Sequence, residues 1–286
     1  MMYLTLRIYV PLHVSGVWIP HYSENPIESG STGAGLTLAS YLIAEEVSEC
    51  TILLNNTRVL VDQAMETCRE FGTSLGVSAR SNFNLGSGFG LSAALLISHN
   101  IIVHNARGES LLKALQRAHV LEVKYRTGLG DVIAEYTGGF VVRVKPGAPG
   151  VGVAYKIPVK SPVDIVLVEI NGAEFTGSML SRMSHELLSI GVRLLERILS
   201  EQDLRVFFES ARVFTSKLFN YGIVEDAVRN LRGIVDYYLK KAALVLWTER
   251  EYTWDILSEL RKRGLKAHYA TISPIGVHVV DTPKSP

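Results

Sequence analysis

The hydrophobic pattern divides the chain into short alternating stretches and longer runs of helical spacing. Apolar and polar residues alternate over 3–10, which predicts a strand that ends at Pro11, and an irregular loop is expected from there to Pro26. The apolar run 36–43 predicts a second strand, which follows a glycine-rich segment over 28–35. We therefore expect the chain to begin with two strands joined by a long, glycine-rich connection.

A hairpin is predicted across Asn55-Asn56, a pair that favours tight turns. Before residue 150, the pattern further predicts a helix over 62–71 with Asp62 as its cap, a strand over 77–84, helices over 92–104 and 109–124, and a strand entered through Gly138-Gly139. After it, a strand is expected over 164–170, followed by a mostly helical region over 178–240 with breaks near Gly191 and Gly222. The chain then continues with a strand over 242–247, a helix over 253–262 ended by Gly264, and strands over 265–273 and 275–280. Strands and helices alternate unevenly, and this order favours the α+β class.

The densest cluster of proline and glycine, residues 146–150, is typical of a boundary between two lobes. We expect an N-terminal lobe over 1–150, which carries the glycine-rich loop described below, and a C-terminal α/β lobe over 151–286. A chain of 286 residues with 47% hydrophobic and 20% charged residues is long and apolar enough for a sizeable core in either arrangement.

Composition and charge exclude several classes of protein. The net charge of +1 provides no basic field for nucleic acid, and no apolar run approaches the roughly 20 residues of a membrane span. The two cysteines, Cys50 and Cys68, lack metal-binding spacing and are expected to be buried or free thiols in a reducing compartment. We therefore expect a cytoplasmic protein that binds neither nucleic acid nor membrane.

The main candidate for chemistry is the glycine-rich loop around Gly86, Gly88 and Gly90, which joins a predicted strand to a predicted helix. A loop of this kind lets the backbone approach phosphate at a helix N-terminus. It is not a Walker A motif, because no lysine precedes Ser92, and its glycines are too closely spaced for a dinucleotide fingerprint. A tight turn without a ligand is the alternative on local grounds.

Polar residues at the end of this loop and downstream of it favour a nucleotide site. Ser92 can cap the predicted helix or bind a metal. His119 and Glu122 share one helix face, and Asp131 follows in a glycine-flanked loop. Magnesium bound together with phosphates needs only one or two carboxylates or hydroxyls from the protein, so Ser92 and Glu122 suit it. Asp131 is then available to face the hydroxyl that accepts the phosphoryl group.

These segments resemble the motifs of the GHMP kinases, and most closely the archaeal pantoate kinase branch. The matching segments cover essentially the whole chain: Pro11–Gly16, Gly30–Gly35, Asn84–Ala94, Ala118–Glu122, Thr127–Val132 and Gly138-Gly139. The resemblance implies a two-lobed fold, with an N-terminal lobe like domain 2 of ribosomal protein S5 and a ferredoxin-like C-terminal lobe. It also implies a homodimer that uses ATP and Mg²⁺ to phosphorylate the primary hydroxyl of pantoate during coenzyme A synthesis.

The resemblance also implies roles for individual residues. Ser92 and Glu122 are expected to hold the metal, and Asp131 to act as catalytic acid or base or to orient the attacked hydroxyl. His119, Arg143 and Thr176 are the expected pantoate-binding residues; from local pattern alone, His119 could be a satisfied helix histidine and Arg143 a strand-face ion pair. The loop expected to bind ATP consists of Gly86, Ser87, Gly88, Phe89, Gly90, Leu91 and Ser92.

The chain departs from the general GHMP pattern at two places. His13 stands where many of these kinases have lysine, a feature of the pantoate branch, and the C-terminal glycine-rich motif is reduced to Ser273–Gly276. Two other functions remain as alternatives: a kinase for another small alcohol, such as homoserine, shikimate or mevalonate, and a non-catalytic module that senses a metabolite. The intact Ser92, Glu122 and Asp131 argue against the second.

Overall fold

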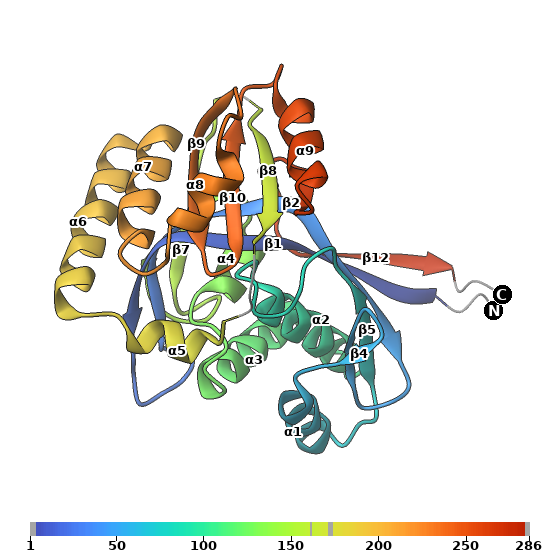
Figure 1. The fold of residues 1–286 in the computed structure, drawn as a ribbon. Helices are drawn as coiled ribbons and strands as arrows, with labels where there is room; N and C mark the ends of the chain where they lie inside the picture. Colours follow the sequence, from blue (N-terminus) through green and yellow to red (C-terminus); the bar gives the residue numbers. More distant parts are fainter. Residues whose placement is uncertain (1–3, 161, 171–173, 284–286) are drawn as a thin grey trace.

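Two β-sheets organise the part of the chain that this computed structural model describes, residues 4–160, 162–170 and 174–283 (Figure 1). The first sheet has eight strands: β1 (Leu4–His21), β2 (Gly30–Val47), β3 (Ile52–Leu54), β4 (Thr57–Arg58), β5 (Gly76–Arg80), β6 (Phe140–Lys145), β7 (Val153–Ile157) and β12 (His278–Pro283). Four form the second: β8 (Asp164–Glu169), β9 (Ile234–Lys240), β10 (Ala243–Thr248) and β11 (Lys266–Ala270). The α+β, two-lobed architecture predicted from the sequence is confirmed.

The long hairpin of β1 and β2 corrects the first two expected strands. β1 does not end at Pro11 but continues to His21, and the pairing with β2 shifts register at Pro11/Leu12 and again around Gly16. A bulge accommodates a proline, which has no N–H for the ladder, so the chain passes through a residue that normally ends a strand. The predicted irregular connection to Pro26 is therefore mostly strand.

The glycine-rich segment 28–35 is also largely strand, because β2 begins at Gly30. A methyl group added at Gly33 would overlap the carbonyl oxygen of Val17, and one at Gly35 would overlap the ring of His13. Here the glycines allow two backbones and a buried histidine to pack closely, rather than forming a loop. Composition alone could not separate this use of glycine from that of the loop near residue 88.

Four helices pack below the first sheet in Figure 1: α1 (Val61–Phe71), α2 (Leu91–Asn105), α3 (Leu111–Lys124) and α4 (Asp131–Thr137). Leu60, not Asp62, is the cap residue of α1. Nearly every residue of α2 is buried, which is expected for a helix that is apolar on all sides. The short helix α4 was missed by the sequence prediction, which placed a loop and the approach to a strand there. It ends at Gly138, whose φ of 75° strains any other residue.

The second sheet confirms the predicted ferredoxin-like lobe. Its strand order is β11-β8-β10-β9, all pairs are antiparallel, and helices separate β8 from β9 and β10 from β11. The helices are α5 (Thr176–Ser181), α6 (His185–Glu201), α7 (Leu204–Thr215), α8 (Gly222–Val228) and α9 (Thr253–Lys262). Two details were wrong: Gly191 lies inside α6, and β9 replaces the end of the expected helical region.

The division of the chain at residue 150 stays a prediction, but the two sheets do not separate there. β7 and β12 both follow residue 150 and belong to the first sheet, where β12 pairs with β1. One face of the second sheet packs against the hydrophobic core of the first sheet, through residues such as Leu167 and Val245. Helix α9 covers its other face. The β9–β10 hairpin thereby reaches the loops of the first sheet.

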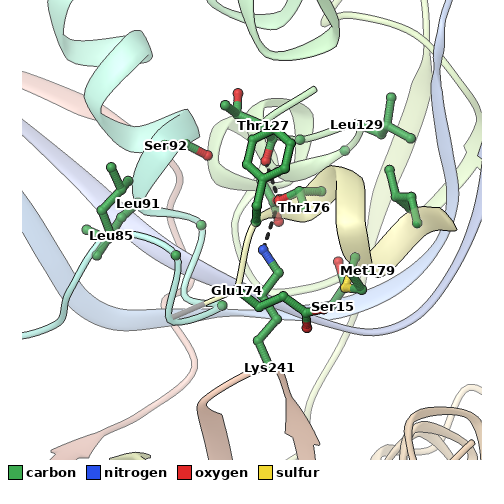
Figure 2. A pocket seen from close by; sticks show the side chains of 18 of the residues that line it. Ser15, Leu85, Leu91, Ser92, Thr127, Leu129, Glu174, Thr176, Met179 and Lys241 are labelled. Carbon is green, nitrogen blue, oxygen red and sulfur yellow. Dashed lines mark hydrogen bonds between the residues drawn. The ribbon is translucent and has the colours of Figure 1, made fainter. Parts of the chain in front are cut away.

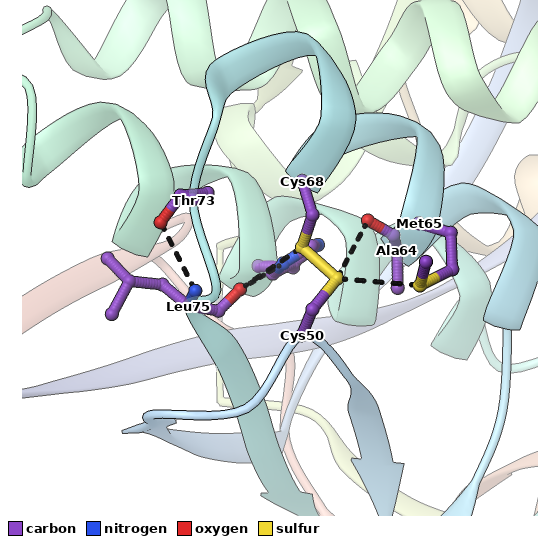
Figure 3. The surroundings of a disulfide bond; sticks show 7 residues. Cys50, Ala64, Met65, Cys68, Thr73 and Leu75 are labelled. Atoms are coloured by element: carbon purple, nitrogen blue, oxygen red, sulfur yellow. Dashed lines mark hydrogen bonds between the residues drawn. A yellow bond between two sulfur atoms is a disulfide. The ribbon is translucent and has the colours of Figure 1, made fainter.

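Cys50 and Cys68 form a disulfide (Figure 3), so the expectation that they are buried or free thiols in a reducing compartment is wrong. Cys50 precedes β3 and Cys68 lies on α1, so the bridge requires α1 to fold back over the start of that strand. Spacing in the sequence carries no sign of this approach.

In the described ranges we find no helix with the length and apolar character needed to span a membrane.

Candidate active site

A cavity of about 360 Å³ lies between the two sheets, where the glycine loop, the segment 127–131, helix α5 and the β9–β10 turn meet (Figure 2). Its polar lining includes Ser15, Ser31, Asp62, Gln63, Ser92, Thr127, Asp131, Glu174, Thr176, Lys240 and Lys241. Leu60, Leu85 and Tyr125 are among the residues that add apolar surface to the lining. A mostly apolar hollow with a few convergent polar groups is typical of a small-molecule site.

The glycine loop leads directly into the N-terminus of α2. Gly86, Gly88 and Gly90 all have positive φ, and Gly90 is the residue that precedes the first turn of the helix. The Ser87 hydroxyl donates to the carbonyl oxygen of Asn84 at 2.6 Å and braces the loop. Three positive-φ glycines followed by free helix N–H groups create a surface suited to an anion.

Ser92 lines the cavity and contacts Glu122, which lies directly behind it; their predicted role as metal ligands stays a prediction. The Ser92 hydroxyl donates to Glu122 Oε1 at 2.6 Å, and Thr127 donates to the same oxygen at 3.1 Å. The other oxygen, Oε2, is buried and finds no hydrogen-bond partner among the described residues. Burial, with the nearby Asp131 charge, raises the pKa of Glu122 to about 7. Either a proton or a cation can satisfy such a carboxylate near neutral pH.

Asp131 begins α4 and is held by charged and polar neighbours. Its Oδ1 lies 2.6 Å from His13 Nδ1 and 3.6 Å from Lys240 Nζ. Burial alone would raise the pKa of Asp131, but Lys240, His13 and Arg143 lower it well below its usual range. The side chain is therefore a carboxylate at neutral pH, and it faces the cavity, where a substrate hydroxyl can reach it.

His13 connects Asp131 to Arg143. Arg143 Nη1 lies 3.4 Å from His13 Nε2, and because a guanidinium can only donate, Nε2 accepts and Nδ1 carries the proton directed at Asp131. Burial lowers the pKa of His13 to about 4, so the ring is neutral. The arrangement fixes the orientation of the Asp131 carboxylate without placing a second cation in direct contact with it.

Arg143 is fully buried behind the cavity rather than exposed in it. Its other bonds reach the carbonyl oxygen of Ser31 and the hydroxyl of Ser15, both at 3.3 Å, and these two serines line the cavity. Burial lowers the pKa of Arg143 to about 10, which still leaves it charged at neutral pH. The positive charge of Arg143 therefore lies one layer behind the cavity surface, and its predicted role in substrate binding stays a prediction.

Glu135 is a buried carboxyl that the sequence prediction did not include. Neither of its oxygens has a hydrogen-bond partner in the described part of the chain, and it packs against Gly90 and the His13 backbone. Burial, with the charges of Asp131 and Glu122, raises the pKa of Glu135 well above its usual range. The raised pKa favours the protonated form of Glu135, which reduces repulsion among the three close carboxyl groups.

The opposite wall of the cavity comes from the second sheet. Lys241 donates to the Thr176 hydroxyl at 2.8 Å, and Thr176 donates to the carbonyl oxygen of Thr127 at 2.7 Å (Figure 2). Burial, with the neighbouring Lys240, lowers the pKa of Lys241 to about 8. Neither lysine was singled out in the sequence, because residues up to 240 were assigned to a mostly helical region and the turn between β9 and β10 was not predicted.

The predicted site residues separate into two groups. Gly86, Gly88, Gly90, Leu91, Ser92, Asp131 and Thr176 line the cavity, and Glu122 lies directly behind Ser92. Ser87 and Phe89 are buried braces of the loop, Phe89 by stacking on Phe83. His119 is buried and bonded through Nε2 to the Ser29 carbonyl oxygen at 2.8 Å, away from the lining residues. The reduced motif Ser273–Gly276 packs against Gly138-Gly139.

Comparison with known sequences identifies relatives that match most of the chain. The pantoate kinase of Methanocaldococcus jannaschii is 30% identical over 234 residues, a match that covers 78% of this chain and 83% of the relative. The chain belongs to the pantoate kinase family. The pantoate kinase of Thermococcus kodakarensis is 28% identical over 266 residues, with 85% of each chain covered. No family model matches the sequence.

Solved structures confirm that the fold is that of the GHMP kinases. A phosphotransferase related to the CoA biosynthesis pathway superimposes with a TM-score of 0.81, covering 96% of this chain and 98% of its own, at 24% identity. Mevalonate-3-kinase from Thermoplasma acidophilum superimposes with a TM-score of 0.63, covering 98% of this chain and 98% of its own, at 13% identity. At these identities the likeness concerns the fold alone.

Proposed function

We propose that the chain transfers the γ-phosphoryl group of ATP to the primary hydroxyl of D-pantoate and forms 4-phosphopantoate for coenzyme A synthesis. The observation that carries this proposal is that Ser92 and Asp131 line one cavity at the N-terminus of α2, with Glu122 bonded to Ser92 directly behind it. The names of the relatives support the acceptor, since those proteins are pantoate kinases. Phosphoryl transfer depends mainly on positioning and on neutralising charge, and the cavity offers both.

The ATP end of the cavity is the glycine loop with the first turn of α2. The backbone N–H groups around Gly88 and Gly90 are suited to the β- and γ-phosphate oxygens, and the helix dipole favours their charge. Leu60, Leu85 and Tyr125 give an apolar surface for the base. In this proposal Ser87 and Phe89 act through the shape of the loop, which they brace.

The donor set fits a magnesium ion that enters with ATP. Within the described ranges no group of three or more His, Cys, Asp or Glu is placed to hold a metal, but Mg²⁺ bound to phosphates needs fewer protein ligands. Ser92 Oγ and the unpartnered Glu122 Oε2 are the atoms that would hold it. When bound, the ion would neutralise charge on the phosphate oxygens.

Asp131 is suited to orienting the attacking hydroxyl rather than to strong base catalysis, because its lowered pKa makes it a weak base. Its carboxylate accepts a hydrogen bond from the primary hydroxyl of pantoate. A bond forms between that oxygen and the γ-phosphorus. At the same time the bond between the γ-phosphorus and the β–γ bridging oxygen breaks, and its electron pair leaves with ADP. The hydroxyl proton passes to Asp131 and then to solvent.

The substrate end is proposed to lie at Ser15 and Ser31, in front of Arg143. The guanidinium supplies the positive charge for the pantoate carboxylate, and Thr176 closes the other side from α5. His119 would act by holding the Ser29 carbonyl and so the start of β2. We also propose a cytoplasmic homodimer, and light scattering tests the dimer directly.

The deciding experiment measures ADP release with D-pantoate, and with pantothenate, homoserine, shikimate and mevalonate as competing acceptors at equal concentration. Turnover on pantoate at least ten times that on each other acceptor is the expected result. Higher turnover on one of the other alcohols would reject pantoate as the acceptor. Binding of ATP without turnover on any of them would reject the kinase and favour the sensing module.

A further inference from the structure

The turn between β9 and β10 places two consecutive lysines in the same cavity. Lys240 is the last residue of β9, and Lys241 and Ala242 form the turn before β10 begins at Ala243. Successive side chains of a strand point to opposite faces, so neighbours in sequence seldom share a site. Here Lys241 has a φ of 58°, which breaks the alternation, and both side chains line the cavity.

A lysine is an unfavourable residue for this backbone conformation. Positive φ costs a residue with a Cβ on the order of 1 kcal/mol, and glycine is preferred where a two-residue hairpin turn has positive φ at its first central position. Strain of this kind is a reason to look for a use of the side chain. The Lys241 ammonium is directed at Thr176 in the cavity wall, not at solvent (Figure 2).

The turn is fixed against the glycine loop by its backbone. The Ala242 N–H donates to the carbonyl oxygen of Ser87 at 3.0 Å, and a methyl group added at Gly88 would overlap the carbonyl oxygen of Lys240. The Lys240 ammonium lies 3.6 Å from Asp131 Oδ1 and 5.9 Å from the centre of the Trp18 ring. Both lysines are therefore positioned by contacts within the site itself.

The two lysines of the turn supply positive charge to the cavity. Among the described residues that line the cavity, Lys240 and Lys241 are the two cations, whereas Asp62, Asp131 and Glu174 are acidic. A triphosphate carries several negative charges, and the metal pair neutralises part of them. The two ammonium groups are therefore the side chains of the cavity lining that can offset the remaining negative charge.

We propose that the β9–β10 turn completes the phosphate site from the second sheet: Lys241 binds phosphate oxygens of ATP, and Lys240 contacts the phosphoryl group in transfer beside Asp131. The proposal rests on the kinase function proposed above. Neither lysine forms or breaks a covalent bond. The phosphorus passes from the ADP oxygen to the substrate oxygen, the proton goes to Asp131, and the ammonium groups offset the charge on the transferred oxygens.

Lys241 is tested by binding of a non-hydrolysable ATP analogue with Mg²⁺, measured by calorimetry with no acceptor present. Lys241→Gly relieves the backbone strain while removing the charge, so we expect an unchanged or higher Tm together with a Kd raised ~10-fold or more. Lys241→Arg keeps the charge and should stay within ~3-fold of wild type. A Kd for Lys241→Gly within about twofold of wild type overturns the proposal for Lys241.

Gln202→Gly is the matched control for this substitution. Gln202 also has a positive φ, 49°, and it follows helix α6, away from the cavity-lining residues. The control reports how much Tm changes when such strain is relieved, and it should leave the Kd unchanged. If Lys241→Gly is too unstable to measure, Lys241→Gln answers the same question about the charge.

Lys240 is tested by steady-state kinetics with D-pantoate. Lys240→Met should lower kcat ~100-fold, with a much smaller change in the KM for ATP, and Lys240→Arg should recover part of the loss. A purely structural role would lower Tm and leave the kcat of the folded fraction close to wild type, and that result overturns the proposal for Lys240. An increase confined to the KM for pantoate would do so as well.

The proposed function and the proposed role of the turn fail in different ways. If wild-type protein shows no turnover on pantoate, the proposed function is wrong, and the analogue-binding experiment still decides whether the turn binds phosphate. If wild type turns over pantoate but the lysine variants match it in Kd and kcat, the proposed function stands and the role of the turn is wrong.

Discussion

The two walls of the cavity are built in opposite ways. The wall from the first sheet consists of contiguous motifs, a glycine loop and a helix start followed by the segment 127–131, and its side chains are mainly hydroxyls and carboxylates. The wall from the second sheet consists of isolated side chains on α5 and on the β9–β10 turn, and it carries both cavity lysines. One wall offers backbone N–H groups and metal ligands, and the other offers positive charge.

The difference shows how a phosphoryl-transfer site can be divided between two sheets. A nucleotide needs closely spaced backbone donors, which only a continuous segment supplies. Charge neutralisation needs only that an ammonium group reaches the right place, whichever element carries it. The first requirement leaves a pattern in the sequence, and the second leaves almost none. If this division is correct, substitutions in the two walls should have separable effects on catalysis, binding and stability.

Removing the charge of Asp131 should affect catalysis and leave nucleotide binding intact. Asp131→Asn keeps the size of the side chain but loses the carboxylate that orients the hydroxyl, so we expect kcat to fall ~1000-fold, with the Kd for ATP nearly unchanged. Kinetics and calorimetry on the same preparation test this. Asp226→Asn, at an exposed position on α8, is the control. Full activity of the Asp131→Asn variant would remove Asp131 from the mechanism.

Forcing the walls apart should weaken ATP binding. In Gly88→Ala the added methyl group meets the Lys240 carbonyl oxygen, and the backbone keeps a φ of 107° that alanine rarely adopts. We expect the Kd for ATP to rise ~30-fold or more and Tm to fall, because strain and overlap each cost on the order of 1–3 kcal/mol. Calorimetry and thermal unfolding measure the two effects.

Gly108→Ala separates the overlap from the backbone strain. Gly108 has a φ of 67°, and nothing lies within 4 Å of an added methyl group. This control should lose stability by about 1 kcal/mol and keep its affinity for ATP. Equal effects of the two substitutions on the Kd would show that contact between the walls does not matter for binding.

The pH dependence of stability should reveal the buried ammonium of the second wall. The pKa of Lys241 is about 8 in the folded chain, against an ordinary value of 10.5. Between these values the unfolded chain binds more protons, so stability increases as pH rises through the window. Relative to Lys241→Met, wild type should gain at most about 3 kcal/mol from about pH 8 to 10.5, as measured by urea unfolding. A flat difference would show that Lys241 is not desolvated.

The first wall was largely predictable from the sequence because local chemistry determines it. Gly86, Gly88 and Gly90 need positive φ, and that need restricts the residue type at each position. Ser92 and Glu122 are 30 residues apart, but each is fixed by a helix, α2 or α3, whose boundaries the apolar pattern gave to within about two residues. Packing of two regular helices then brings them together.

The second wall and the pair behind Asp131 could not be predicted in this way. Lys240 reaches the cavity only because β9 pairs with β10 in a sheet assembled from distant segments, and β9 itself was assigned to helix. His13 was noted as a departure from lysine, but its bond to Asp131 depends on β1 continuing through Pro11. Glu135 lies on a seven-residue helix too short to show a period. All three positions depend on tertiary contacts, which the local sequence pattern does not predict.

Because Cys50 and Cys68 form a disulfide, the oxidation state of a protein preparation has to be known when its activity is measured. The bridge ties the segment before β3 to helix α1, and the first turn of that helix carries Asp62 and Gln63 into the cavity. Reduction of the bridge by dithiothreitol would release this tie at one edge of the cavity. Kinetic constants from two laboratories can be compared only when the thiol content of each sample has been titrated.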